Sequence, residues 1–323
     1  MGSIVPGLMI CVTIALAATF LSEHYGGPQF LYALLFGVSL NFLASSASAR
    51  PGIEFASRTM LRLGVALLGA RITLAQVQDT GWSTALLVVF ALMATLAFGI
   101  LLGRHLLGST AIGVLTGGAV AICGASAAMA LASVLPRHEE TQRYTLLTVA
   151  VITLLSTLCM LIYPVLAHAL GLDARATGIF LGATIHDVAQ VVGAGYMISP
   201  EVGDVATVVK LMRVAMLLPV VALCALCLRQ RGDDRRASPL AAMPWFLLAF
   251  AALVVLTSME WVSPPVARTM QDASQWCLVV AIAALGTRTS VQQLAQVGWR
   301  PTAILVANTV FLVVLVGGML TLA

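Results

Sequence analysis

The first residues in this chain that could do chemistry form a short polar run inside a long apolar segment. Thr184, His186, Asp187 and Gln190 lie near the middle of the predicted helix 175–198. The first, third and fourth of them recur every third residue and would share roughly one helix face. Ionisable groups at mid-bilayer cost about 2.5–3.5 kcal/mol each on insertion scales, so they are candidates for binding a substrate or carrying a proton. The alternative is a structural pair that satisfies a buried helix end.

The next predicted helix, 203–229, supplies the opposite charge. Lys210 is the only lysine in the chain and stands three residues before Arg213. Two cations against the carboxylate of Asp187 leave this neighbourhood at about +1 when His186 is neutral, which favours an anionic ligand. The alternative is that the two cations only neutralise Asp187 and the carbonyl groups of interrupted helices.

Two segments carry the pattern of discontinuous helices. Each begins with GxxxG and then turns small or polar at mid-span, in the ranges 113–126 and 178–190. Such clusters at membrane depth are tolerated where the freed backbone groups line a cavity. A second half-helix starting near Thr184 would turn its N–H groups toward an anion. We therefore add Cys123, Gly124 and Ser126 to the candidate substrate-binding residues. The alternative is close helix packing through GxxxG.

Three further arginines could attract anions or gate their passage: Arg62, Arg71 and Arg288. Arg71 and Arg288 lie near predicted helix ends, where a cation also complements the helix dipole and reaches the headgroups. Arg62 lies mid-helix and is expected to be placed more deeply.

The sequence lacks the motifs of the common catalytic sites. It has no HExxH, no GxSxG, no paired acidic motif for magnesium and a diphosphate, and no phosphate-binding loop. We therefore expect no enzyme activity, no cofactor and no metal site, and we keep a membrane-embedded enzyme only as an alternative of another class.

The composition predicts the elements that position these residues. Of 323 residues, 30 are charged (17 Lys+Arg and 13 Asp+Glu), 60% are hydrophobic, and the mean hydropathy is +1.01. A soluble domain of this size carries roughly 25% charged residues. Basic residues are scattered singly, which argues against nucleic acid as a partner. The chain is predicted to be an all-α polytopic membrane protein whose partner is the lipid bilayer.

Hydropathy predicts eleven transmembrane helices. They cover 4–22, 28–45, 55–77, 82–104, 109–135, 141–169, 175–198, 203–229, 243–260, 264–286 and 299–322. The positive-inside rule favours a cytoplasmic N-terminus and an external C-terminus. We expect one transporter domain over 1–323, in which a cytoplasmic loop at 229–242 separates 1–228 from 243–323.

An internal repeat predicts inverted halves. Leu68-Gly69-Ala70-Arg71 recurs as Leu285-Gly286-Thr287-Arg288, and Gly81-Trp82 recurs as Gly298-Trp299 at the same offset of 217. Six predicted helices separate the two copies, so they would enter the membrane from opposite sides, as in many secondary transporters. Chance matching between two leucine-rich helices is the alternative.

Several of these segments resemble the YeiH-like family of proposed sulfate exporters, which are bacterial inner-membrane proteins. The resemblance covers essentially the whole chain and is carried by Arg50-Pro51-Gly52-Ile53, Leu61 to Arg71, Ile122 to Ala127, Gly182 to Val192, and Val209-Lys210-Leu211 with Arg213-Val214. Met212 and Asp187 depart from the family pattern, where a small polar residue and a glutamate are usual. The resemblance implies sulfate as the substrate and the bacterial inner membrane as the location.

The sequence thus predicts a secondary transporter for a small inorganic anion, sulfate or a related sulfur oxyanion, that works as an exporter. The second hypothesis is a sodium- or proton-coupled cation antiporter in which Asp187 binds the cation. As a further partner we consider a second copy of the chain, forming a homodimer.

Overall fold

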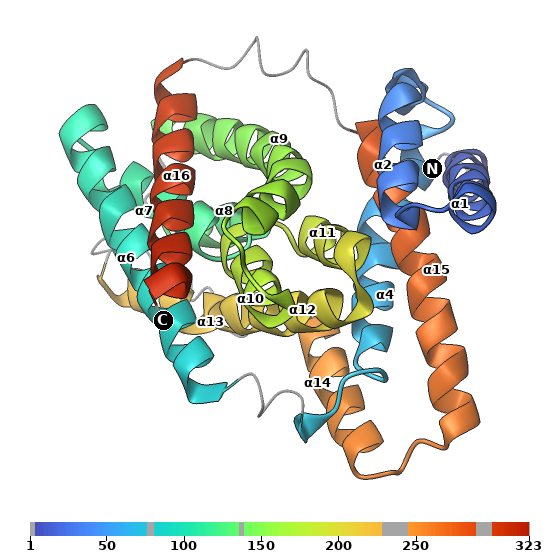
Figure 1. Cartoon of the computed structure of the whole chain (residues 1–323). Helices are drawn as coiled ribbons and strands as arrows, with labels where there is room; N and C mark the ends of the chain where they lie inside the picture. The colour runs from blue at the N-terminus through green and yellow to red at the C-terminus, as the bar shows by residue number, and fades with distance from the viewer. Residues whose placement is uncertain (1–3, 76–80, 136–138, 228–244, 289–298, 323) are drawn as a thin grey trace. The chain divides into compact units, whose positions relative to one another are not determined.

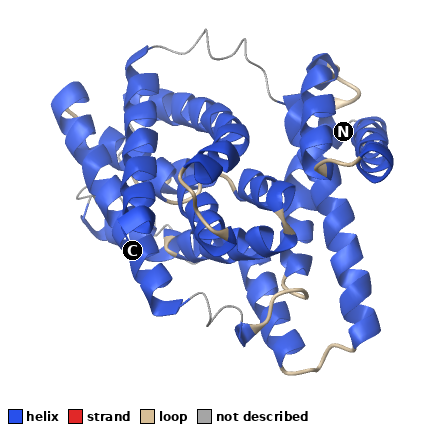
Figure 2. Cartoon of the chain, in the orientation of Figure 1, coloured by secondary structure: helices blue, strands red, loops and turns tan. Residues whose placement is uncertain are grey.

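The computed structural model describes residues 4–75, 81–135, 139–227, 245–288 and 299–322. Within these residues the regular structure is entirely helical, with no strand (Figure 2). In the described part of the chain, five helices are long and apolar enough to cross a membrane: Val5–Tyr25, Gly81–Leu107, Glu139–Ala169, Pro200–Leu226 and Thr302–Leu322. Shorter apolar helices accompany them. Each of the eleven ranges from hydropathy contains at least one helix among the described residues, while the number of spans stays a prediction.

Contacts between backbone positions divide the chain into two units. The first comprises residues 1–81, 192–204 and 245–290, and the second comprises 82–191, 205–244 and 291–323. Helices α11 (Val188–Ile198) and α12 (Pro200–Ala215) each begin in one unit and end in the other. The predicted loop at 229–242 lies outside the described residues.

The first unit packs its helices through close backbone contacts. Its elements are α1 (Val5–Tyr25), α2 (Gln29–Ser39), η1 (Asn41–Ser45), α3 (Arg50–Phe55), the π-helical turn η2 (Ala56–Met60), α4 (Leu61–Leu68), α14 (Trp245–Ser258) and α15 (Pro264–Arg288). Helix α15 packs against α2 and α4. A Cβ added at Gly37 would lie 2.3 Å from the Ala283 carbonyl oxygen, so the contact between α2 and α15 requires glycine.

The second unit contains the two segments that were predicted to be interrupted. Its elements are α6 (Gly81–Leu107), α7 (Thr110–Ala121), α8 (Ala125–Ala132), α9 (Glu139–Ala169), α10 (Ala174–Thr184), α13 (Leu217–Cys227) and α16 (Trp299–Leu322). Helix α7 lies against α8, α9 and α16 (Figure 1). The Phe98 ring on α6 stacks on the Phe311 ring on α16 with centroids 4.3 Å apart.

Both interruptions are present in the structure. Ser109 caps the start of α7, which ends at Ala121, and α8 begins four residues later at Ala125. Asp173 caps α10, which ends at Thr184 before Ile185 turns extended, and α11 begins at Val188. The second half-helix starts at Val188 and not near Thr184, because the chain remains helical through the predicted break at Gly182.

The GxxxG motif at 113–117 also packs closely, as the alternative interpretation held. A Cβ added at Gly99 of α6 would lie 2.4 Å from the Gly117 Cα, and one added at Gly103 would lie 2.4 Å from the Gly113 Cα. Close packing and interruption therefore occur in the same segment, since the glycines precede the break. The inverted repeat stays a prediction, because its second copy runs into 289–298, outside the described residues.

Candidate functional site

Lys210 and Arg213 lie on α12 and bind the carbonyl groups at the two interruptions. Lys210 Nζ donates to the carbonyl oxygens of Ile122 and Ile185 at 2.9 and 2.8 Å. All three guanidinium nitrogens of Arg213 also donate to backbone carbonyl oxygens. Nε donates to Ala121 at 3.0 Å and Nη2 donates to Val120 at 2.7 Å. Nη1 donates to Gly182 at 3.1 Å and to Ile185 at 3.0 Å. One cationic pair therefore ties the end of α7 to the end of α10.

The burial of these cations explains why they bind carbonyl groups. Lys210 is 0% exposed and Arg213 is 2% exposed, and no other Lys, Arg, Asp or Glu among the described residues is buried. The last carbonyls of a helix lack intrahelical partners and carry the negative end of its dipole. Two helix ends thus provide acceptors for two buried cations, while the cations complete the hydrogen bonds that the interruptions remove.

His186 lies in the α10–α11 interruption, next to the α7–α8 interruption. Its side chain is fully buried, and its Nε2 is 3.1 Å from the Thr309 hydroxyl on α16. A Cβ added at Gly124 would lie 3.5 Å from the His186 Cβ, so the α7–α8 break touches the α10–α11 break. The His186 Nδ1 atom is buried with no hydrogen-bond partner among the described residues. Such orphaned polar atoms are rare and mark places where a ligand or proton can bind.

Asp187 begins α11. Its Oδ1 accepts a hydrogen bond from the Ala189 backbone N–H at 2.9 Å, which is the geometry of an N-cap, and its own N–H donates to the Ser156 hydroxyl on α9 at 3.0 Å. The carboxylate is half-buried and interacts electrostatically with Lys210. Asp187 therefore combines a structural capping role with a charge beside the cationic pair.

The other candidate substrate-binding residues lie either in one of the two interruptions or on the helices next to them. Cys123 is buried in the first break, and Gln190 is buried on α11 with its Oε1 lacking a partner among the described residues. The Thr184 hydroxyl donates to Phe180 of its own helix at 2.6 Å. Ser126 is exposed on α8. The structure thus brings Cys123, Gly124, His186, Asp187, Lys210 and Arg213 together around the breaks.

The three additional arginines lie in the first unit. Arg62 has an exposed side chain on α4, and Arg288 Nη1 donates to the Ser57 hydroxyl at 2.9 Å. Arg71 forms an ion pair with Asp204, with its Nε 3.1 Å from Oδ1. Asp204 was not singled out from the sequence, although the two acids Glu201 and Asp204 before Lys210 in a largely apolar segment were a usable signal.

Two further side chains at the site, those of Thr309 and Ser156, could not have been singled out from the sequence. Each is one of several hydroxyl residues inside a long apolar helix, and residues of this kind often bond only to their own helix. Their contacts with His186 and with the Asp187 N–H arise from packing between α16, α9 and the interruption. No three His, Cys, Asp or Glu residues in the described part of the chain gather closely enough to hold a metal ion.

These observations define a class: a helical membrane protein with two interrupted helices whose ends are held by buried cations. The family model described as conserved hypothetical protein 698 matches residues 6–305. The chain belongs to this family, whose curated members are called UPF0324 membrane proteins. The family resemblance found from the sequence motifs is confirmed.

Similar proteins are known from several bacteria. UPF0324 membrane protein CT0845 of Chlorobaculum tepidum is 51% identical over 97% of this chain and 88% of its own length. UPF0324 membrane protein TauZ of Paracoccus denitrificans is 47% identical over 96% of this chain and 93% of its own length. TauZ of Paracoccus pantotrophus is 48% identical over the same shares. No solved structure matches the chain.

Proposed function

We propose that this membrane protein is a secondary transporter for a small inorganic anion and carries out no covalent chemistry. The observation that carries the proposal is the pair of buried cations, Lys210 and Arg213, at the contact between two interrupted helices. Discontinuous helices at membrane depth form the binding sites of many secondary transporters. The polar atoms that lack intrahelical partners at such breaks are available to bind a substrate.

The charge of the site supports an anion. Every nitrogen of Arg213 donates to backbone carbonyls, so neither cation needs to bind the substrate directly. Their charge acts through space, and with one carboxylate at Asp187 the sum is about +1. Screening is weak in a buried site, so this excess attracts an anion over several ångströms.

Sulfate or a related sulfur oxyanion is the proposed substrate, because the resemblance to the YeiH-like family implies it. Export is the proposed direction. With the cell interior negative by about 100 mV, moving a dianion outward gains roughly 4–5 kcal/mol at about 2.3 kcal/mol per charge. Import would require at least two co-transported cations merely to cancel this term.

A cation or proton antiporter is the second candidate, and the orphaned atoms favour it. His186 Nδ1 and Gln190 Oε1 are buried without hydrogen-bond partners among the described residues. An imidazole nitrogen can accept a proton, and an amide oxygen can coordinate a cation. The half-buried Asp187 carboxylate supplies a negative charge beside them. In this candidate Lys210 and Arg213 are internal counterions.

Electrophysiology on proteoliposomes distinguishes the two functions. The purified protein is exposed to sulfate, thiosulfate, sulfite and chloride at constant sodium, and then to sodium at constant chloride. Sulfur oxyanions should produce the larger charge movement, with the sign of anion transfer. Lys210→Gln removes one charge but keeps an N–H donor for the carbonyls, and it should lower the apparent anion affinity. Sodium-driven currents that are insensitive to every anion would favour the antiporter.

A further inference from the structure

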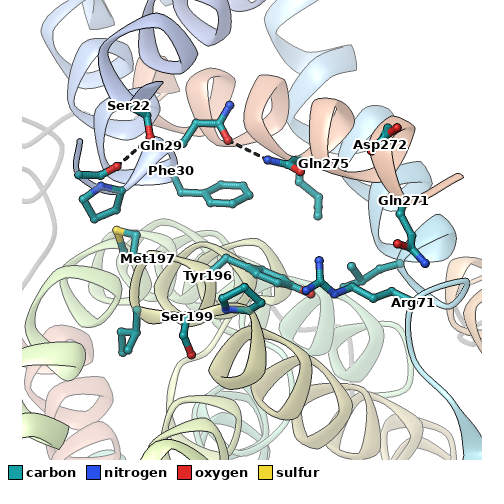
Figure 3. A pocket seen from close by; sticks show the side chains of 16 residues that line it. Ser22, Gln29, Phe30, Arg71, Tyr196, Met197, Ser199, Gln271, Asp272 and Gln275 are labelled. Carbon is teal, nitrogen blue, oxygen red and sulfur yellow. Dashed lines mark hydrogen bonds between the residues drawn. The ribbon is translucent and has the colours of Figure 1, made fainter. Parts of the chain in front are cut away.

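The first unit contains a second candidate site. A cavity of about 560 Å³ opens between α1, α2 and α15 on one wall and the turn from α11 to α12 on the other. Figure 3 shows Gln29 and Gln275 on one wall and Arg71 with Tyr196 on the facing wall, with the Phe30 ring between them. None of these residues belongs to the helix interruptions, and the cavity lies wholly within the first unit.

Among the described residues, Arg71 is the one cation that lines this cavity, and its position is fixed by two contacts. Its Nε donates to Asp204 Oδ2 at 3.2 Å, and its guanidinium carbon lies 5.5 Å from the centre of the Tyr196 ring. The Tyr196 hydroxyl donates to the same Asp204 carboxylate. Both Nη groups of Arg71 therefore remain available, because no described residue accepts from them. In Figure 3 an outer nitrogen of Arg71 points into the space between the walls.

An arginine held in this way presents a planar pair of donors that matches an oxyanion. Arg71 faces two acids, its partner Asp204 and the exposed Asp272 on the wall, so the formal charge around the cavity is about −1. An anion must therefore be held by the directed Nη donors of Arg71 and not by net charge, which disfavours a dianion more than a monoanion. The volume also exceeds what an inorganic ion needs and falls in the range of pockets for small organic ligands. An apolar body fits beside the aromatic pair Phe30 and Tyr196, whose ring centres are 6.0 Å apart.

We propose that this cavity binds a small organic monoanion, with its carboxylate or sulfonate on the Nη groups of Arg71 and its apolar body against Phe30 and Tyr196. The facing wall adds selectivity. Gln275 Nε2 donates to Gln29 Oε1 at 3.1 Å, and Gln29 Nε2 donates to Thr19 at 2.6 Å, which leaves the Gln275 carbonyl oxygen as an acceptor for a polar group on the ligand. This site is independent of the proposed transport site.

Equilibrium binding to the full chain in detergent tests the proposal. The probes are benzoate and benzenesulfonate, with benzamide as the neutral analogue and sulfate as the inorganic oxyanion, measured by calorimetry. Benzoate or benzenesulfonate should bind more tightly than benzamide and sulfate. Arg71→Gln should weaken the organic anions about tenfold or more, because a charge-assisted bidentate contact is lost. Arg71→Lys should retain part of the affinity, since the charge remains without the fork.

Arg58→Gln is the matched control, because Arg58 lies in the same unit but pairs with Glu54 at 3.7 Å and does not line the cavity. Its affinities should equal those of the unchanged protein. Equal binding of benzoate and benzamide, or unchanged affinity in Arg71→Gln, would overturn the proposal. Because no transport is measured, failure of the proposed transport function leaves this result unaffected, and the reverse also holds.

A thiol placed on the wall keeps the test decisive if Arg71→Gln does not fold. Ser22 lines the cavity and its hydroxyl donates only locally, to the Gly27 carbonyl at 2.7 Å, so Ser22→Cys should fold. Saturating benzoate should slow maleimide labelling of this thiol severalfold, whereas benzamide at the same concentration should not. The unchanged protein gives the background from the native cysteines. Labelling that is indifferent to benzoate would exclude an anion at this site.

Discussion

At the scale of single residues, the two buried cations act first as hydrogen-bond donors to the backbone. Arg213 reaches Val120, Ala121, Gly182 and Ile185, whereas Lys210 reaches Ile122 and Ile185. The guanidinium thus serves three carbonyls that have no donor from Lys210. The positive charge of Lys210 and Arg213 and their hydrogen bonds to the carbonyls are separate contributions to the site, and substitutions can distinguish them.

Arg213→Ala is expected to destabilise the protein strongly. It leaves the carbonyls of Val120, Ala121 and Gly182 without their side-chain donor, at about 1–3 kcal/mol for each buried group left unsatisfied. The thermal unfolding midpoint in detergent measures the loss. Arg62→Ala is the control, because its exposed side chain makes it nearly neutral. Equal midpoints for the two variants would mean that the carbonyl contacts contribute nothing to stability.

Asp187→Asn separates the capping role of this residue from its charge. Asparagine caps helices as well as aspartate, so α11 should keep its start and the protein its stability. If Asp187 only holds the cations electrostatically, the more positive site should bind the anion at least as tightly and release it more slowly. If Asp187 carries a proton, transport should lose its pH dependence.

Transport rate and apparent affinity across pH 5 to 8 decide between these roles. His186→Gln belongs in the same series, because its amide can still bond to Thr309 but cannot carry a proton at these pH values. Values equal to those of the unchanged protein at every pH in both variants would remove the pair from the mechanism.

At the scale of the elements, the shape of the site depends on how the first interruption turns. Gly124 stands between α7 and α8 with φ 64° and ψ −127°, a conformation that residues with a Cβ rarely adopt. Its N–H donates to the Ala119 carbonyl at 2.8 Å, and its Cα faces His186. The turn therefore places the backbone of one break against the side chain of the other.

Gly124→Ala is expected to impair both stability and transport. The backbone strain costs about 1–3 kcal/mol, and any shift of the break that relieves it alters the contact with His186, whose Cβ would lie 3.5 Å from the added Cβ. Gly108→Ala is a matched control, because Gly108 has φ 63° but no atom within 4 Å of an added Cβ. The control should lose stability by a similar amount while its apparent anion affinity stays unchanged. An equal change of affinity in both variants would mean that strain alone accounts for the effect.

The interruptions also show how much of the site can be predicted from the sequence. Glycines and polar residues at mid-span predicted both breaks, because such residues are poor neighbours for lipid. The second break lies at Ile185 to Asp187, a few residues after the predicted place, since the ends are set by contacts with Lys210 and Arg213 from α12. A local sequence pattern carries no information about these contacts, because they join helices that are far apart in the chain. The use of both cations on carbonyls was one of two interpretations that charge and spacing left open.

The cavity of the first unit likewise depends on contacts between distant residues that the sequence does not show. Arg71 was a candidate from the sequence, but its ion pair joins residues 133 positions apart, and Tyr196 and Asp204 face it only because α11 and α12 fold back on each other. Glycine allows that turn to be tight, because a Cβ at Gly195 would lie 2.7 Å from the Gly203 Cα. The sequence therefore predicts which residue types matter and not which of them meet.

At the scale of the whole molecule, each unit has its own candidate site, and the chain passes between the units inside helices. It leaves the second unit within α11 and returns within α12, so Asp204 and Lys210 lie on one helix although they serve different sites. Helices α11 and α12 therefore contribute residues to both candidate sites.

The orientation of the chain in the membrane gives the last prediction. Eleven spans place the two termini on opposite sides, and the arginines of the 229–236 segment favour the cytoplasmic side for that loop and for the N-terminus. A fluorescent protein that matures only in the cytoplasm should therefore be bright when fused at the N-terminus or within 229–242. A phosphatase active only outside the cytoplasm should be active after Ala323. A bright fluorescent fusion after Ala323, together with a cytoplasmic N-terminus, would require an even number of spans. The two copies around Arg71 and Arg288 would then no longer need opposite orientations, and the inverted-repeat interpretation would be abandoned.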